Sequence, residues 1–183
     1  YKQETAFQQR AGMYAPVKHF GLDKDAKQKD CDSVVKWLKK FNLVLVQINN
    51  TNNRPENNFG ITEQQIKILK AVMKNSKVVC SVFANPYSLA KIDSIELSDA
   101  LMMSYENSVL IEDLSAQLIF GGIAAKGKLP VTVSVNYKLG EGIETAAPIR
   151  FKYTIPEELG YDSKNFQVID SIALNAINEK AFP

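Results

Sequence analysis

Gly122, Gly127 and Lys128 nearly reproduce the spacing of a phosphate-binding P-loop. A P-loop needs a strand before its glycines, a helix after them, and a Ser or Thr directly after the Lys to hold magnesium. Here Leu129 and Pro130 follow the Lys, the segment before the glycines has helical spacing, and the segment after them alternates as a strand. Because this order is the reverse of a P-loop, we interpret the glycines as a helix cap and a turn.

Three short strings have the order of motifs found in serine β-lactamases and penicillin-binding proteins. They are SVVK (Ser33 to Lys36), YEN (Tyr105 to Asn107) and KLG (Lys138 to Gly140). The Ser-x-x-Lys spacing places a nucleophile and a base on one face of a helix, which gives the motif its chemical content. KLG lacks the Thr of K-T-G, and the chain between Tyr105 and Lys138 is too short for the large domain that those enzymes carry there. A serine hydrolase that uses Ser33 and Lys36 therefore remains only a second alternative.

Polar residues follow three predicted buried strands, at the strand ends where open α/β sheets bind their ligands. The loops concerned are Asn49–Gly60, Asn85–Tyr87 and Glu106–Asn107. Glu56 and Glu106 have the chemistry of general acids, but exposed loop carboxylates are mostly solvated, so neither is assigned a catalytic role. Arg54, Asn85 and Tyr87 are the candidate contacts for a sugar or a peptide. We expect the Asn-rich loop to be mobile in isolation, since it offers little apolar burial.

The single histidine and the two cysteines do not form a metal or redox motif. His19 lies at the end of a predicted strand, and we interpret it as a structural or surface residue. Cys31 and Cys80 belong to different predicted elements, so a CxxC pair is excluded. Cys80 lies inside an apolar strand and is interpreted as a small buried hydrophobe. We therefore expect neither a metal nor a cofactor.

Strand and helix patterns alternate along residues 13–135. The predicted strands are Met13–Phe20, Leu43–Ile48, Lys77–Ala84, Asp99–Tyr105 and Pro130–Val135, and the predicted helices are Asp32–Asn42, Thr62–Met73 and Ser108–Phe120. Several strands are apolar throughout, which is typical of a parallel sheet covered on both faces. The pattern predicts a three-layer α/β sandwich with helices on both faces of a mostly parallel sheet of five or six strands. The third helix is expected to bury Leu110, Leu114, Leu118 and either Val109 or Ile111.

The composition is that of a globular protein without an electrostatic specialisation. The 183 residues are 45% hydrophobic and 23% charged, with a net charge of +2, so there is no electrostatic case for nucleic acid or an anionic membrane. The longest apolar runs are far below membrane-spanning length. The chain opens without an initiator Met and stops directly after a helical pattern, so we expect it to be a segment of a longer protein. A Gly- and Pro-rich stretch after Tyr137 suggests a domain at 1–140, followed by a linker and one helix at 141–183.

The stretch DALMMSYENSVLIEDLSAQLIFGGIAAKGKLPVTV resembles the closing section of the second domain of glycoside hydrolase family 3. In that family a strand and a helix lead to an L-f-G segment, a short loop of small residues, and G-r-L-P-V-t-v. The matching positions here are Phe120, Gly121, Gly127, Lys128, Leu129, Pro130 and Val131. FNLVLVQINN, FGITEQQIKIL and VVCSVFANPYSL are also similar, so the resemblance covers about residues 10–140. The tail IPEELGYDSKNFQVIDSIALNAINEKAFP looks like the lead-in to a serine β-lactamase-like domain.

The resemblance implies an accessory, non-catalytic α/β domain from the β-N-acetylglucosaminidase-like branch of that family. The family performs retaining hydrolysis of glycosidic bonds with an Asp on an N-terminal (β/α)8 barrel, which this chain lacks. In many members the sandwich lends a Glu, whereas in this branch a His/Asp pair on the barrel is thought to serve instead. No residue here matches the lent Glu by motif, so no catalytic residue is carried over. The implied partners are the barrel and a C-terminal serine β-lactamase-like domain of the same chain, in a periplasmic or secreted protein. The alternative is a carbohydrate- or peptide-binding module.

Overall fold

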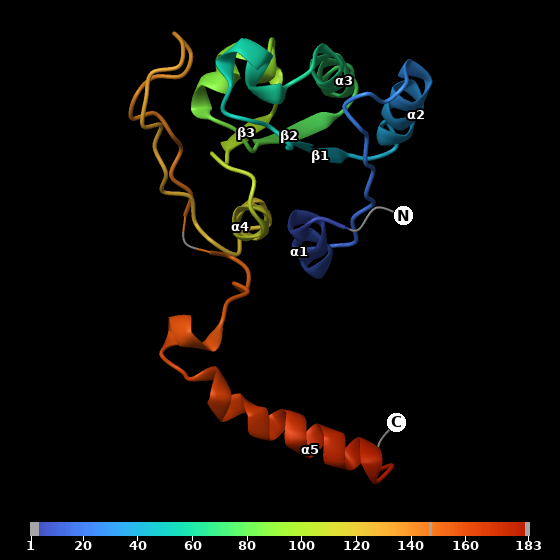
Figure 1. The fold of residues 1–183 in the computed structure, drawn as a ribbon, viewed down its shortest axis with the longest axis vertical. Helices are drawn as coiled ribbons and strands as arrows, with labels where there is room; N and C mark the ends of the chain where they lie inside the picture. Colours follow the sequence, from blue (N-terminus) through green and yellow to red (C-terminus); the bar gives the residue numbers. More distant parts are fainter. Residues whose placement is uncertain (1–3, 147, 182–183) are drawn as a thin grey trace. The chain divides into compact units, whose positions relative to one another are not determined.

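The computed structural model describes residues 4–146 and 148–181. The chain divides into two compact units, Tyr1–Arg150 and Phe151–Pro183. The sequence pattern had placed the corresponding boundary after residue 140. The first unit belongs to the mixed α/β class, with helices packed on a small parallel sheet (Figure 1).

The sheet of the first unit has three strands in the order β1-β2-β3. They are β1 (Leu43–Ile48), β2 (Lys77–Val82) and β3 (Ala100–Met103), and both neighbouring pairs are parallel. All three had been predicted from their apolar runs. Their carboxyl ends therefore meet at one edge of the sheet.

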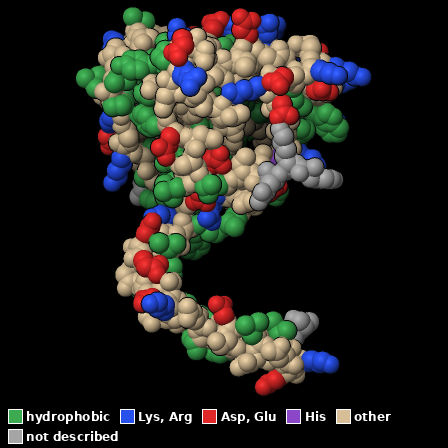
Figure 2. Space-filling model, viewed as in Figure 1, with side chains coloured by type: hydrophobic (Ala, Val, Ile, Leu, Met, Phe, Trp, Pro, Cys, Tyr) green, Lys and Arg blue, Asp and Glu red, His purple; other side chains and the backbone are tan. Residues whose placement is uncertain are grey.

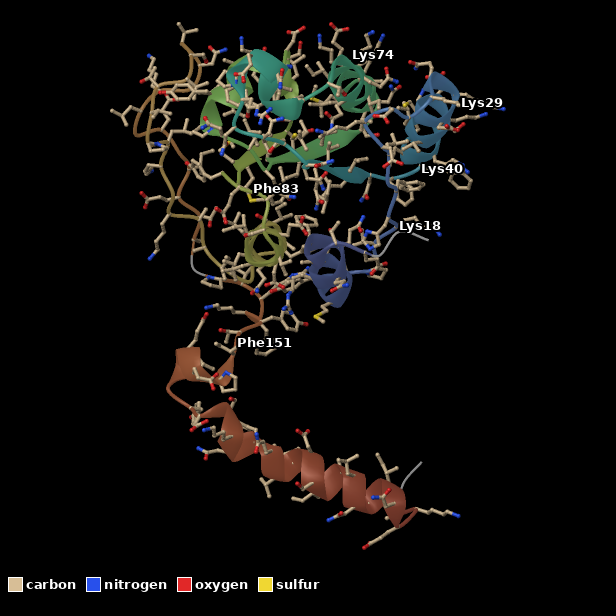
Figure 3. All side chains as sticks on the ribbon, in the orientation of Figure 1. Lys18, Lys29, Lys40, Lys74, Phe83 and Phe151 are labelled. Carbon is tan, nitrogen blue, oxygen red and sulfur yellow. The ribbon has the colours of Figure 1, made fainter. Side chains whose placement is uncertain are left out.

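Helices cover both faces of this sheet, as the apolar strands indicated (Figure 1). The helices α2 (Gln28–Leu38) and α3 (Glu63–Met73) lie on one face, and α1 (Ala6–Tyr14) and α4 (Val109–Ile119) lie on the other. Val44 and Ile48 of β1 enter the core beneath α3, whereas Leu45 packs in the second core with residues of α1 and α4. Phe83, just after β2, is fully buried between the sheet and α4 (Figure 3).

Capping boxes fix the starts of two of these helices. The Thr62 hydroxyl accepts from the Gln65 amide at 3.2 Å, and the Gln65 side chain accepts from the Thr62 amide at 2.9 Å. Thr5 and Gln8 make the same reciprocal pair before α1. Each box satisfies two amides that have no partner inside the helix. The first box was predicted from the sequence, and the second was missed.

Two predicted strands and one helix start were wrong. Met13 and Tyr14 belong to α1, and residues 15–20 form no strand. The segment Pro130–Val135 bends back on its own continuation, with Val133 donating to the Tyr137 carbonyl at 2.8 Å. An alternating pattern does not specify which segment a strand pairs with. Pairing with the nearest segment in sequence costs the least loop-closure entropy, because the loop between the two is the shortest. Helix α2 starts at Gln28, before the predicted caps Asp32 and Ser33.

The buried face of α4 differs in part from the prediction, since Leu114 and Leu118 are only half-buried, whereas Ile111 does pack in the second core. The buried residues of this helix are Glu112, Ser115, Ala116 and Gln117, whereas Leu110 is 65% exposed. The physical reason is a polar network between α1 and α4 that apolar spacing alone does not reveal.

That network gives the buried polar groups of α4 their partners. Glu112 accepts from the Ala6 amide at 3.1 Å, at the start of α1. Asp113 accepts from Arg10 Nε at 2.6 Å and from Gln117 Nε2 at 2.6 Å. Because these groups are paired, α4 can bury polar side chains without leaving them unsatisfied.

The second unit contains two short 3-10 turns, Pro156–Leu159 and Ser163–Phe166, and helix α5 (Gln167–Asn178). None of the residues that the structure describes in 151–181 is buried. Val168, Ile169 and Ile172 of α5 are 58%, 58% and 64% exposed. Across the described parts of both units, no helix is long and apolar enough to span a bilayer.

Candidate functional site

The candidate site lies at the carboxyl edge of the three-stranded sheet. The loop after β1 carries Arg54 and Glu56, the turn after β2 carries Asn85 and Tyr87, and Glu106 follows β3. The strand order places these segments in sequence along the edge. Open parallel sheets bind ligands at this edge, because every strand delivers its following loop there.

The loop Asn49–Gly60 is organised by hydrogen bonds. Asn52 N donates to the Phe59 carbonyl at 2.9 Å, and Phe59 N donates to the Arg54 carbonyl at 3.0 Å. The Phe59 side chain is only 3% exposed and anchors the loop. Lys24 Nζ, from the segment before α2, donates to the carbonyls of Asn50 and Gly60 at 2.5 and 2.6 Å. The loop therefore has a defined path in spite of its polar composition.

Left-handed backbone marks the same loop. Asn58, Phe59 and Gly60 have φ values of 51°, 54° and 75°. A Cβ on Gly60 would come within 2.8 Å of Asn52 Nδ2, so only glycine fits there without a shift of that side chain. For a bulky residue such as Phe59 this conformation is costly, and the surrounding contacts must hold it.

The candidate binding residues after β1 and β2 lie on neighbouring elements. The 3-10 segment Pro55–Gly60 (η1) contacts the 3-10 segment Pro86–Lys91 (η2). Tyr87 is 49% exposed, and Arg54 is also exposed. The Asn85 side chain accepts from the Tyr87 amide at 3.1 Å and so caps η2, which gives this residue a structural role.

The two candidate carboxylates of this edge lie in the loops after different strands. Glu56 and Glu106 are both exposed, and they follow the two outer strands of the sheet, with β2 between them. Tyr105, next to Glu106, is left-handed at φ 59° and donates weakly to the Lys128 carbonyl at 3.4 Å. The edge is therefore a polar and aromatic surface that also carries charged side chains.

Ser33 and Lys36, the alternative nucleophile and base, both lie on α2. The Ser33 hydroxyl donates to the Lys29 carbonyl, one turn earlier in α2, at 2.8 Å. Both side chains are exposed on α2. Figure 1 places α2 and β3 at opposite ends of the sheet, and Tyr105 follows β3 in the chain.

The single histidine and the two cysteines lie in surroundings that do not activate them for chemistry. His19 Nε2 lies 3.9 Å from Glu4 Oε1 at the surface. Cys31 and Cys80 are free and buried, and burial raises the pKa of the Cys80 thiol to about 12. The Cys80 thiolate, the nucleophilic form, is therefore suppressed near neutral pH. No group of three His, Cys, Asp or Glu side chains suited to a metal ion occurs within residues 4–146 and 148–181.

Charge is mixed rather than gathered in one patch on the face of the first unit that Figure 2 shows. Figure 2 shows Lys and Arg side chains interspersed with Asp and Glu over the first unit.

No family model, no curated protein and no solved structure matches this chain.

The sequence reasoning missed the residues that hold the loop in place. These are Lys24, Thr51 and Phe59, of which Thr51 Oγ1 donates to the Phe83 carbonyl at 2.5 Å. A single aromatic residue inside a polar loop was the one available signal, because such a residue is a natural anchor. Lys24 gave no comparable signal among the other lysines.

Proposed function

We propose that residues 1–140 are the accessory α/β sandwich domain of a β-N-acetylglucosaminidase-like enzyme of glycoside hydrolase family 3. The observation that carries this proposal is the corner between residues 119 and 131. Helix α4 ends at Ile119, Gly121 follows at φ 79°, and Gly122 N donates to the Gln117 carbonyl at 2.7 Å. A glycine with left-handed backbone is a common way to end a helix, and the L-f-G segment of the family pattern has its glycine at the position of Gly121.

We propose that this domain is not catalytic. Retaining glycosidases hold two carboxyl groups about 5–5.5 Å apart. The segments that carry Glu56 and Glu106 start two strand spacings apart, about 10 Å, with β2 between them. Both carboxylates are also exposed, so nothing positions them as a pair. In the proposed parent enzyme the chemistry belongs to the barrel.

The larger assembly is part of the same proposal. Among the described residues, β1 and β3 each pair on one side only, and unpaired strand edges favour the addition of further strands. We propose that the sheet reaches five or six strands in the parent protein. A barrel upstream and a serine β-lactamase-like domain downstream would be its neighbours, in a periplasmic or secreted enzyme.

The coding region on both sides of this segment tests the proposal. A (β/α)8 barrel upstream and an S-x-x-K domain downstream are expected. A different pair of neighbours would contradict the assignment. Turnover of an aryl N-acetylglucosaminide by the purified 183-residue chain would contradict the non-catalytic role.

A second candidate function is a module that binds a sugar or a peptide at the carboxyl edge. It is favoured by the contact between η1 and η2, which brings the segments of Arg54 and Tyr87 together. An NMR titration with soluble oligosaccharides discriminates the two, because a purely structural domain should show no localised shifts. Shifts confined to the amides around Arg54, Asn85 and Tyr87 would favour the binding module.

A further inference from the structure

A lysine from outside the Asn49–Gly60 loop bridges its two ends. Lys24 is half-buried, and its ammonium donates to the Asn50 carbonyl at 2.5 Å and to the Gly60 carbonyl at 2.6 Å. An ammonium has three donors, so a single group can serve both carbonyls. The two contacts close the segment between Asn50 and Gly60 into a ring.

The path inside this ring depends on groups that hold one another in place. Asn52 N donates to the Phe59 carbonyl, and the Asn52 side-chain oxygen accepts from Arg54 N at 2.9 Å. Asn50, Asn58 and Phe59 have left-handed backbones, which an untethered loop would leave for lower-energy conformations. A charged donor that bridges both ends opposes that relaxation, because hydrogen bonds from charged groups are the stronger ones.

We propose that Lys24 is a positioning residue of the carboxyl edge. Its ammonium fixes the ring, the ring sets the path of η1, and η1 in turn sets where Arg54 and Glu56 stand relative to Tyr87. The part of this inference that concerns ligands rests on the binding function proposed for this edge. The part that concerns the loop stands without it.

The test compares Lys24→Met with Lys24→Arg in the full 183-residue chain. Methionine keeps most of the length of the side chain but has no donor, whereas the arginine guanidinium can still donate to two carbonyls. Amide hydrogen exchange is measured at Asn52 and Phe59, and at the β2 residues Val78–Val82 as an internal reference. Lys29→Met is the matched control, because Lys29 projects into solvent from α2 (Figure 3).

In Lys24→Met we expect exchange at Asn52 and Phe59 to rise on the order of tenfold or more, which is the scale of losing charge-assisted hydrogen bonds. Exchange in β2 should stay unchanged. Lys24→Arg should recover at least part of the protection, and Lys29→Met should behave as the wild type. Unchanged loop exchange in Lys24→Met would overturn the proposal. Equal acceleration in the loop and in β2 would also overturn it, because Lys24 would then stabilise the whole fold.

A ligand titration distinguishes a failure of the Lys24 role from a failure of the proposed binding function. Wild-type chain is titrated with N,N′-diacetylchitobiose, a neutral N-acetylglucosamine disaccharide, and shifts are followed around Arg54 and Tyr87. If the wild type binds, Lys24→Met should weaken the affinity and Lys24→Arg should restore it. Unchanged affinity in Lys24→Met would overturn the positioning role for the ligand. If the wild type shows no shifts, the binding function fails for this sugar, and the exchange result alone decides the role of Lys24 in the loop.

Discussion

Helix α3 in the first unit and helix α5 in the second have similar lengths and similar apolar spacing, yet their surroundings differ. Leu69 and Val72 of α3 are 1% and 2% exposed, because the helix lies on β1 and β2. Ile169 and Ile172 of α5 are 58% and 64% exposed. Spacing therefore decides which face of a helix is apolar, whereas burial needs a second surface that the chain must also provide.

This difference in burial indicates which unit contributes most of the free energy of unfolding. A 12-residue helix with no packed face is marginal in water, whereas a helix packed on a sheet gains from every apolar group that leaves the solvent. The first unit should therefore carry nearly all of the free energy of unfolding.

The largest effect is expected from removing a core side chain of α3. Leu69→Ala should lower the free energy of unfolding by about 2–5 kcal/mol, the range for large-to-small core substitutions. Ile172→Ala on α5 should change it by less than about 0.5 kcal/mol. Denaturant unfolding followed by circular dichroism measures both. A comparable loss in the two variants would show that α5 is buried as deeply as α3.

The polar network between α1 and α4 should give the next largest effect. Asp113→Ala leaves Arg10 and Gln117 without their shared acceptor, in a region where the Arg10 and Asp113 side chains are 20% and 23% exposed. We expect a loss of about 1–3 kcal/mol in the free energy of unfolding. Asp32→Ala on the exposed side of α2 is the control and should cost less than about 0.5 kcal/mol. Equal losses would contradict a stabilising network.

Alkaline pH should weaken the first unit through Cys80. Burial raises the pKa of this thiol from 9.0 to about 12, so the folded protein keeps a proton that the unfolded chain releases above about pH 9. Stability is therefore lost as the pH rises, by about 1.4 kcal/mol from this group at pH 10. The free energy of unfolding at pH 8 and pH 10 measures this. Cys80→Ala should remove that part of the dependence, and an identical slope in the variant would refute the assignment.

No effect at all is expected from covalent labelling at Ser33. A fluorophosphonate probe reacts with serines that a nearby base activates, and the Ser33 hydroxyl instead donates to the Lys29 carbonyl. Intact mass spectrometry of treated wild type and Ser33→Ala should give the same unlabelled masses. Labelling of the wild type that disappears in Ser33→Ala would support the serine hydrolase hypothesis.

The parts of the fold that the sequence predicted were those with local or unambiguous signals. Thr62 and Gln65 specify a helix start within four residues, and the apolar runs of β1 to β3 specify strands covered on both faces. The face of α4 was not predictable from apolar spacing, because it depends on polar partners in α1 about a hundred residues away. The alternating pattern of residues 130–135 is compatible with a strand of the sheet and with a local bend, so it did not determine which segment they pair with.

The candidate site was predictable to a similar degree. Sequence placed Arg54, Asn85 and Tyr87 at strand ends, and the structure puts their segments in contact. It gave no indication that Asn85 caps η2. The role of Lys24 depends on contacts that span 26 and 36 residues, which no local pattern encodes.

The central claim, that this domain takes no part in catalysis, is tested most directly by the turnover of the proposed parent enzyme with Glu56→Gln. Glu56 is the only carboxylate in the Asn49–Gly60 loop, and glutamine keeps its shape while removing the acid. We predict a change in turnover of less than about threefold, because the acid/base step is assigned to the barrel. A loss on the order of a hundredfold or more, with folding unchanged, is the size expected for a missing acid/base group and would contradict the account.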